Sequence, residues 1–423
     1  MQEGYSNIND KGNLGEAFVN QIAYHSFLKY WCFHGPLDIT GDYKEICDLL
    51  VIFDTTCIIV SVKNYDFKDD YSKYFKKTTE KAIRQINGAE RKLFGEREIL
   101  LKHPDRKEMI FEKTKVKEIY RLVINLNTSV KYYRTSFFEN SKHYTVLDAD
   151  AWEGAMSELN SLPDFLDYIR ARCRFFAECP TFILPRSEYD FNVNAEISAS
   201  SEIFTLAEQK KRIVIINGSE LDLIAFYIKN VFSFPDYQTK EGFKSYVFDL
   251  NGEFLKYQQS EASKLKFKYE RESYFIDELV REAIIDHEHG YRLAEMLLKL
   301  NRFDRAEFAR SFLEFHDKYR TGDPTVLMQT SHVVVAGLPL IFLYYNEKCQ
   351  KEEIDTFMYC RILHYHYLTN CEVKEIGVLG MSRIDQRFAF GHSRLETVYT
   401  KEETEDIETQ FKELGWKLRE ELE

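Results

Sequence analysis

The chain of 423 residues has little proline and lacks several common functional motifs. Its 8 prolines argue against a long flexible linker. Neither a Walker-type phosphate loop nor a G-x-S-x-G nucleophile elbow occurs. The long apolar run at residues 333–345 is too short to cross a bilayer and contains Gly337 and Pro339. We therefore expect buried strand there and no contact with a membrane.

Export signals and cysteine pairs are absent too. The N-terminal residues lack the basic and apolar regions of a signal peptide. The chain has 8 cysteines but no C-x-x-C pair, and Cys47 and Cys57 fall within apolar stretches. We expect reduced core residues of a cytoplasmic protein, not disulfides or a zinc site. His364 and His366 likewise lack the spacing of metal ligands.

Net positive charge is also missing. The formal net charge is -12, which argues against a nucleic-acid partner because phosphate binding favours a basic surface. Two segments run against this total. Residues 63–92 hold nine lysines or arginines against five acids, and residues 102–121 hold seven against four. A basic surface on an acidic protein and ordinary solvated helix faces both fit this pattern.

The apolar pattern predicts an α/β protein with two domains. With 44% apolar and 15% aromatic residues, the chain can bury sizeable cores. Residues 48–53 are almost continuously apolar, as in a strand buried on both faces, and a short turn leads to a returning strand. The elements expected in the first domain are a helix capped by Asn13, strands at 48–53 and 57–63, a helix at 71–94, strands at 119–124 and 144–147, and helices to about residue 174.

We place the domain boundary next to Cys179 and Pro180, giving domains 1–178 and 179–423. The second domain also reads as α/β and carries no catalytic motif. Its expected elements are a strand at 212–216, a helix after the turn at 217–219, helices within 272–317, strands at 332–336, 340–345 and 374–379, and a last helix at 401–422.

Three charged residues stand where a metal-dependent site needs them. Glu16 lies on the first helix, Asp48 begins one strand and Lys63 ends the next. Hydrolysis of a phosphodiester uses a divalent cation to neutralise phosphate charge and to generate hydroxide, and Mg²⁺ prefers carboxylate oxygens. Asp48 and Lys63 can meet across the hairpin, where Lys63 would orient the attacking water or contact the phosphate.

Over residues 10–125 this pattern resembles the PD-(D/E)xK nuclease superfamily, whose restriction-endonuclease-like fold is a mixed sheet flanked by helices. The matching positions are Gly15-Glu16, Asp48, Ser61-Val62-Lys63 in the acid-x-lysine slot, and Gln85. The resemblance implies Asp48 and Glu16 as ligands of Mg²⁺ or Mn²⁺, with the Val62 carbonyl as a further ligand. It also implies that Lys63 serves the attacking water and that Gln85 positions the metal or the nucleic acid.

Ser61 departs from the family pattern, because a carboxylate is expected there. Three interpretations are open. A nearby acid such as Asp66 supplies the missing charge, although its odd spacing from Ser61 would turn it away on a regular strand. One metal held by Asp48, Glu16 and the backbone suffices. Or the domain is a degenerate nuclease that binds without cutting.

Each site residue also has an ordinary structural explanation. Glu16 suits a capping-box partner of Asn13, and Asp48 suits a cap before its strand. Lys63 suits a solvated strand end, and Gln85 a polar helix face. The combination points to a site because spacing, strand hydrophobicity and element order agree.

The resemblance thus implies a cytoplasmic, magnesium-dependent endonuclease, with DNA favoured over RNA and a role in restriction or anti-phage defence. By analogy with two-part nucleases, residues 179–423 would recognise a target, regulate cutting, form a homo-oligomer or bind a defence-system partner. The main alternative is a nuclease-fold protein that binds nucleic acid or a protein without cleavage. The acidic total charge supports a third one, an interaction protein with no nucleic-acid contact.

Overall fold

The computed structural model describes residues 11–41, 43–68, 70–126, 133–184, 193–209, 211–236, 245–285, 287, 290–384, 387–396 and 398–418. The chain forms two compact units, Met1–Lys264 and Leu265–Glu423. Both combine helices with a mixed sheet, which confirms the α/β class. A search of these residues finds no helix with the length and apolarity to cross a membrane.

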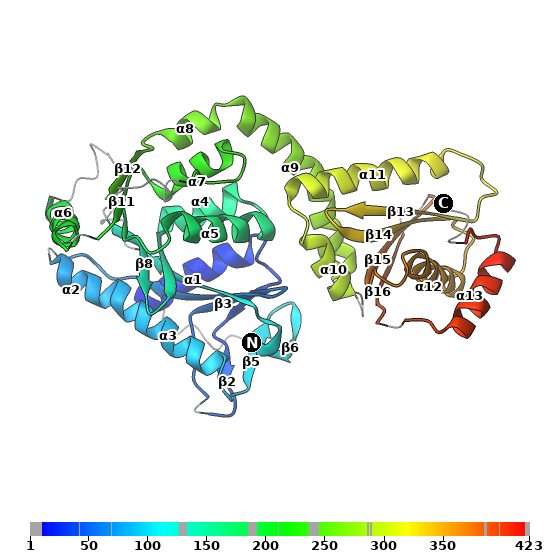
Figure 1. The fold of residues 1–423 in the computed structure, drawn as a ribbon, viewed down its shortest axis with the longest axis horizontal. Helices are drawn as coiled ribbons and strands as arrows, with labels where there is room; N and C mark the ends of the chain where they lie inside the picture. Colours follow the sequence, from blue (N-terminus) through cyan, green and yellow to red (C-terminus); the bar gives the residue numbers. More distant parts are fainter. Residues whose placement is uncertain are drawn as a thin grey trace, which may run out of the picture. The chain divides into compact units, whose positions relative to one another are not determined.

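A mixed sheet organises the N-terminal unit, and nine of the described strands belong to it (Figure 1). Their order across the sheet is β1 (Cys32–His34), β3 (Leu49–Phe53), β4 (Thr56–Lys63), β7 (Glu118–Asn125), β9 (Lys142–Asp148), β8 (Tyr133–Glu139), β10 (Thr181–Ile183), β11 (Ile213–Asn217) and β12 (Ser245–Asp249). The β3–β4 hairpin is antiparallel, and β4, β7 and β9 run parallel. A small second sheet joins β2 (Leu37–Asp38), β5 (Ile99–His103) and β6 (Arg106–Ile110).

Helices cover both faces of this sheet, with α3 and α4 on opposite sides of the strands (Figure 1). The helices of this unit are α1 (Lys11–Tyr24), α2 (Tyr71–Phe75), a π-helical turn (Lys76–Glu80), α3 (Lys81–Leu93), α4 (Ala149–Glu158), α5 (Leu162–Phe176), α6 (Val193–Glu208), α7 (Glu220–Lys229) and α8 (Glu253–Gln258). Helix α9 (Glu261–Leu279) begins in this unit, and most of its residues belong to the C-terminal unit. A 3-10 turn spans Lys113–Lys115.

The sequence explains why β4 lies in the interior of the sheet and why α3 packs beside it. Every residue of β4 is buried, as expected for a nearly continuous apolar strand with parallel and antiparallel neighbours. Helix α3 presents Ile83, Ile86 and Leu93 at helical spacing to the core that includes Ile59. Each such side chain contributes about 1.5–3 kcal/mol when fully buried, so a charge at Ile86 would separate the helix from the hairpin.

The predicted domain boundary at 178/179 is wrong, because it falls inside the N-terminal unit. Strands β10, β11 and β12 continue the sheet from β8, so a boundary there would leave the edge of β8 unpaired. Arg172 of α5 and Glu220 of α7 form a buried ion pair at 2.6 Å across the predicted boundary. The Tyr168 hydroxyl also donates to Glu220, at 2.6 Å.

The C-terminal unit is a four-stranded sheet between helices. Its strands are, in order, β13 (Met328–Val335), β14 (Leu338–Tyr345), β15 (Glu375–Ser382) and β16 (Phe388–Arg394), and only the β14–β15 pair is parallel. Its helices are a π-helical turn (Val280–Ile284), α10 (Gly290–Leu298), α11 (Arg302–Arg320), α12 (Lys351–Leu368) and α13 (Lys401–Glu413). Alternating residues of β14 face opposite helices: Phe342 packs on Phe308 of α11, whereas Leu343 lies in the core that α12 shares.

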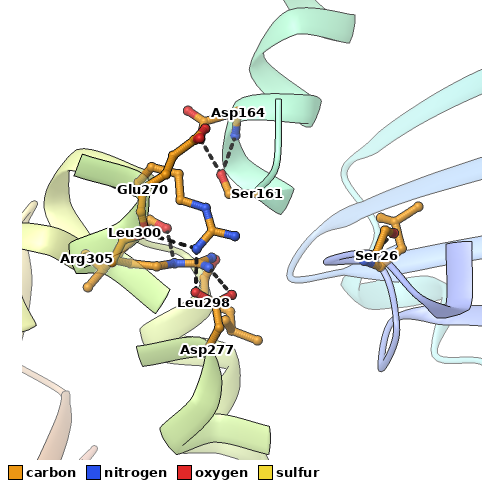
Figure 2. A network of polar contacts seen from close by, with 11 residues as sticks. Ser26, Ser161, Asp164, Glu270, Asp277, Leu298, Leu300 and Arg305 are labelled. Atoms are coloured by element: carbon orange, nitrogen blue, oxygen red, sulfur yellow. Dashed lines mark hydrogen bonds and ion pairs between the residues drawn. The ribbon is translucent and has the colours of Figure 1, made fainter. Parts of the chain in front are cut away.

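A buried arginine ties three helices of this unit together (Figure 2). The Arg305 guanidinium donates to Asp277 of α9 at 2.8 Å and to the carbonyl oxygens of Leu298 and Leu300 at 2.9 and 2.8 Å. Its side chain is 1% exposed, while that of Asp277 is 28% exposed. Asp277 also pairs with Arg302. Arg305 thus pairs with carbonyl groups at the C-terminal end of α10 and just beyond it, where a helix leaves carbonyl groups unpaired.

Two helix ends differ from the sequence expectation. Helix α1 already includes Lys11, so Asn13 lies inside it and is not its N-cap. Helix α13 ends at Glu413 and not at residue 422, because Gly415 adopts a positive φ of 68° that stops it. Ser219 and Thr400 cap α7 and α13 through side-chain bonds with Asp222 and Glu403.

Candidate metal centre

A cleft of about 650 Å³ opens beside the end of strand β4, between α1 and the α2–α3 segment. The five residues predicted for the site all line it: Glu16, Asp48, Val62, Lys63 and Gln85. Ser61 lies next to them on β4 and is 2% exposed. The structure therefore brings the predicted residues together, although they come from four separate parts of the chain.

Glu16 reaches the cleft because α1 packs closely against the end of β4. A Cβ atom at Gly15 would come within 2.8 Å of the Cβ of Asn64 and 3.0 Å of Leu126. Only glycine allows this approach without a shift of the helix. Gly15 thus sets the distance between Glu16 and the strand that carries Lys63.

Asp48 precedes β3 and is held by the neighbouring strand. Its Oδ2 accepts a hydrogen bond from the Ser61 hydroxyl at 3.1 Å and another from the backbone N–H of Val62. The Ser61 hydroxyl also lies 3.5 Å from Oε1 of Gln85 on α3. Ser61 therefore orients the aspartate and does not add a second negative charge.

Lys63 is buried at the head of the cleft. Its ammonium donates to the Ser61 hydroxyl at 2.8 Å and to the Val62 carbonyl at 2.6 Å, and it lies 3.6 Å from Asp48. Burial lowers the pKa of Lys63, and the negative charge of Asp48 opposes this shift. The positive charge of Lys63 therefore lies buried beside the carboxylate of Asp48. Lys63 is not the solvated strand end that was considered above.

Glu45 is the site residue that sequence reasoning missed. It lies ahead of β3, where it forms an isolated bridge with Leu37. Oxygens of Glu16, Glu45 and Asp48 all lie within 4.8 Å of one another. Its carboxylate rests over Gly35, where a Cβ atom would come within 3.1 Å of Oε1 and where φ is +48°. The available signal was the E-x-x-D spacing just before the strand.

Burial and like charge both act on the carboxyl group of Glu45. Its pKa is raised to about 7 by burial of the carboxyl group and by the negative charges of Glu16 and Asp48. Three carboxylates this close are unfavourable unless a cation or proton joins them. The cluster therefore has the electrostatic character of a cation site.

Asp66 does not fill the place opposite Ser61. It lines the same cleft but forms an ion pair with Lys11, and both side chains are at least half exposed. That hydrogen bond with Lys11 lowers the pKa of Asp66. Within the described part of the chain, the group of potential ligands close enough to share one ion is Glu16, Glu45 and Asp48.

The donor set fits a hard divalent cation. Oxygens around Mg²⁺, Mn²⁺ or Ca²⁺ bind at about 2.0–2.6 Å, so opposite ligands stand at most about 5 Å apart. The 4.8 Å limit of the carboxylate cluster meets this condition, and the ligands are oxygens without thiol or imidazole. The Val62 carbonyl, predicted as a further ligand, accepts from Lys63 at the same place.

The cleft is also rich in lysine, and Lys73, Lys77 and Lys81 of the α2–α3 segment form a basic wall. Six lysines line the cleft: Lys11, Lys63, Lys68, Lys73, Lys77 and Lys81. Acids temper part of this charge, since Asp70 accepts from Lys73 at 2.8 Å. Lys81 donates to the Tyr65 hydroxyl at 3.0 Å. The site thus combines an acidic cluster with a basic wall, although the protein as a whole is acidic.

Comparison with protein-family models, with characterised protein sequences and with solved structures finds no match to this chain. The functional argument therefore rests on the site itself.

Proposed function

We propose that the N-terminal unit is a metal-dependent phosphodiesterase that acts on nucleic acid, with Mg²⁺ or Mn²⁺ bound by Glu16, Glu45 and Asp48. The observation that carries this proposal is the convergence of these three carboxylates within 4.8 Å beside the buried Lys63. Glu45 would supply the negative charge that a serine at position 61 lacks. DNA as the substrate and restriction or anti-phage defence as the role come from the family resemblance alone.

The roles of the residues follow from their contacts. A bound divalent cation would neutralise phosphate charge and lower the pKa of a coordinated water. Lys63, desolvated and held by Ser61 at 2.8 Å, has a donor fixed to orient that water or the phosphate oxygen. The bonds from Ser61 and Val62 keep Asp48 in one orientation. Gln85 lines the cleft next to Ser61, where it would contact the substrate.

The anionic substrate class follows from the lysines. A cleft with a basic wall concentrates polyanions locally, whatever the total charge of the protein. A neutral or cationic small molecule would not need six lysines around one carboxylate cluster.

The test is cleavage of supercoiled plasmid, and of single-stranded DNA and RNA, by the purified protein with Mg²⁺, Mn²⁺ or EDTA. We expect cleavage with a divalent metal that is lost in Asp48→Ala and Lys63→Ala. The control is Glu96→Gln, an exposed acid outside the cleft. Binding without cleavage under every metal condition would favour the alternative, a nuclease-fold binding module. Equal cleavage by Asp48→Ala and wild type would refute the assigned site.

A further inference from the structure

The lysines on the cleft wall form a row with regular spacing. Lys73, Lys77 and Lys81 follow one another at intervals of four residues, and Gln85 continues the series. All four residues line the same cleft. They lie on one continuous helical segment, Tyr71 to Leu93, which includes the π-helical turn Lys76–Glu80.

On a regular α-helix these residues would form a row that winds around the helix and would not share one face. Twelve positions separate Lys73 from Gln85, and at 3.6 residues per turn this makes about 3.3 turns, or roughly 120° of misalignment. A π turn bonds each residue to the fifth one along and so takes up about one extra residue. The segment from Lys73 to Gln85 then makes about 3.1 turns, which brings the four side chains onto one face.

The π turn is built into the packing of the unit. Thr78 and Thr79 are buried, and the Thr78 hydroxyl donates to the carbonyl of Tyr74 at 2.9 Å. The turn therefore holds its threonines inward while Lys77 stays exposed. π turns within helices are often found at functional sites.

We infer that Lys73, Lys77 and Lys81 bind successive phosphates of one nucleic-acid strand and lead it to the carboxylate cluster. This inference rests on the proposed function, whose substrate class it specifies. The lysines stand about 6 Å apart along the helix axis, one per turn, which is close to the spacing of neighbouring phosphates in an extended strand. Lysine donates to phosphate as a flexible point charge and reads no base, so the contact is independent of sequence.

Charge and exposure support this assignment. Lys73 is 78% exposed on its side chain and already orients toward an acid, Asp70. Lys81 is fixed beside Tyr65, with its ammonium 5.6 Å from the ring centre. Lys77 stands between them, and Lys76, next to it in sequence, does not line the cleft. The chain thus provides a matched control on the same turn.

The test measures binding separately from cleavage. Fluorescence anisotropy in EDTA gives the affinity for labelled single-stranded DNA, single-stranded RNA and duplex DNA between about 50 and 200 mM salt. In Lys73→Gln/Lys77→Gln/Lys81→Gln, we expect the slope of log affinity against log salt for single strands to fall by about 2, with a tenfold to hundredfold loss of affinity. Lys77→Gln alone should reduce the slope by about 0.7, and Lys76→Gln should not change it.

The outcomes separate this inference from the proposed function. If the triple variant loses salt-dependent binding while wild type never cleaves, the lysine row stands and the nuclease proposal fails. If wild type cleaves but the triple variant binds and cleaves like wild type, the lysine row is refuted and the nuclease proposal stands. Wild type that binds neither DNA nor RNA at low salt refutes the row as well. Preference for DNA or RNA in wild type, lost in the triple variant, identifies the strand that the row holds.

Discussion

The carboxylate cluster of the N-terminal unit and the Arg305 network of the C-terminal unit differ in how their charges are compensated. Arg305 is buried, and its guanidinium donates to a carboxylate and to two carbonyl oxygens. In the cluster, Glu45 instead faces two further carboxylates, which raise its pKa. A charge network that serves stability is complete within the chain, whereas a cluster of like charge needs a partner from outside.

The difference does not arise from the units themselves. The N-terminal unit has its own complete network, in which Arg172 is fully buried against Glu220 and also donates to Thr145 at 3.1 Å. Beside β4 of the same sheet, Glu16, Glu45 and Asp48 lie close together. The ammonium of Lys63 lies 3.6 Å from Asp48. Under the proposed function, this contrast marks the cleft as the place where stability is given up for metal binding.

The largest expected effect comes from breaking the complete network. Arg305→Ala leaves Asp277 without this partner and two carbonyl groups unsatisfied, so we expect the C-terminal unit to lose about 3–5 kcal/mol of unfolding free energy. Urea denaturation followed by circular dichroism measures the loss. Arg310→Ala, which removes a surface pair with Glu272, should cost far less than Arg305→Ala. Similar losses for the two variants would show that burial of Arg305 is not what matters.

Removing a charge from the cluster should act in the other direction. Glu45→Gln relieves repulsion with Glu16 and Asp48, so the metal-free protein should become more stable. Because the cleft is open to solvent, screening limits the gain to less than about 1 kcal/mol. Thermal unfolding in EDTA at pH 8 tests this. Destabilisation by Glu45→Gln, matched by Glu96→Gln, would mean that the carboxylates do not repel one another.

These two predictions show where sequence reasoning succeeded and where it failed. The hairpin, α3, β7 and the placement of Glu16, Asp48 and Lys63 on one cleft followed from apolar periodicity and element order. Glu45 was missed because strand alternation says nothing about the residues before β3, where an isolated bridge and Gly35 direct the side chain. Asp66 was considered instead, but Lys11 holds it.

The pairing of strands that are distant in sequence could not be predicted from the apolar pattern either. Strand β8 and the short strands β1, β2, β5 and β6 were not predicted, since short strands give weak periodic signals. The domain boundary was misplaced because a new segment of the pattern begins near Cys179 and Pro180, whereas Pro180 leads directly into β10 of the shared sheet. The π turn also escaped prediction, because its cause lies in packing around Thr78.

A smaller effect concerns pH and the C-terminal unit. Burial, with the charges of Arg361 and His364, lowers the pKa of His332 to about 4. Its folded pKa lies below the unfolded value of about 6.5, so the stability it contributes is present above pH 6.5 and is lost as pH falls toward 4. In His332→Gln, the urea midpoint should therefore change less between pH 7 and pH 4.5 than in wild type. An unchanged pH dependence would show that His332 does not take up the proton on unfolding.

The smallest effect should follow Asp66→Asn, which tests whether Asp66 belongs to the carboxylate cluster. Asp66 lines the cleft but pairs at the surface with Lys11, so its loss should change cleavage less than about twofold and leave stability essentially unchanged. Plasmid nicking rates compared with Glu45→Gln measure the contrast. A loss of cleavage in Asp66→Asn, with none in Glu45→Gln, would assign Asp66, not Glu45, to the missing acid.

The most direct test of the central claim is calorimetric titration of Mn²⁺ into the metal-free protein. We predict one ion per chain in wild type, with affinity reduced at least tenfold in Glu45→Gln and in Asp48→Asn and unchanged in Asp66→Asn and Glu96→Gln. Wild-type affinity in Glu45→Gln, or no binding by wild type, would contradict the claim that Glu16, Glu45 and Asp48 form a cation site.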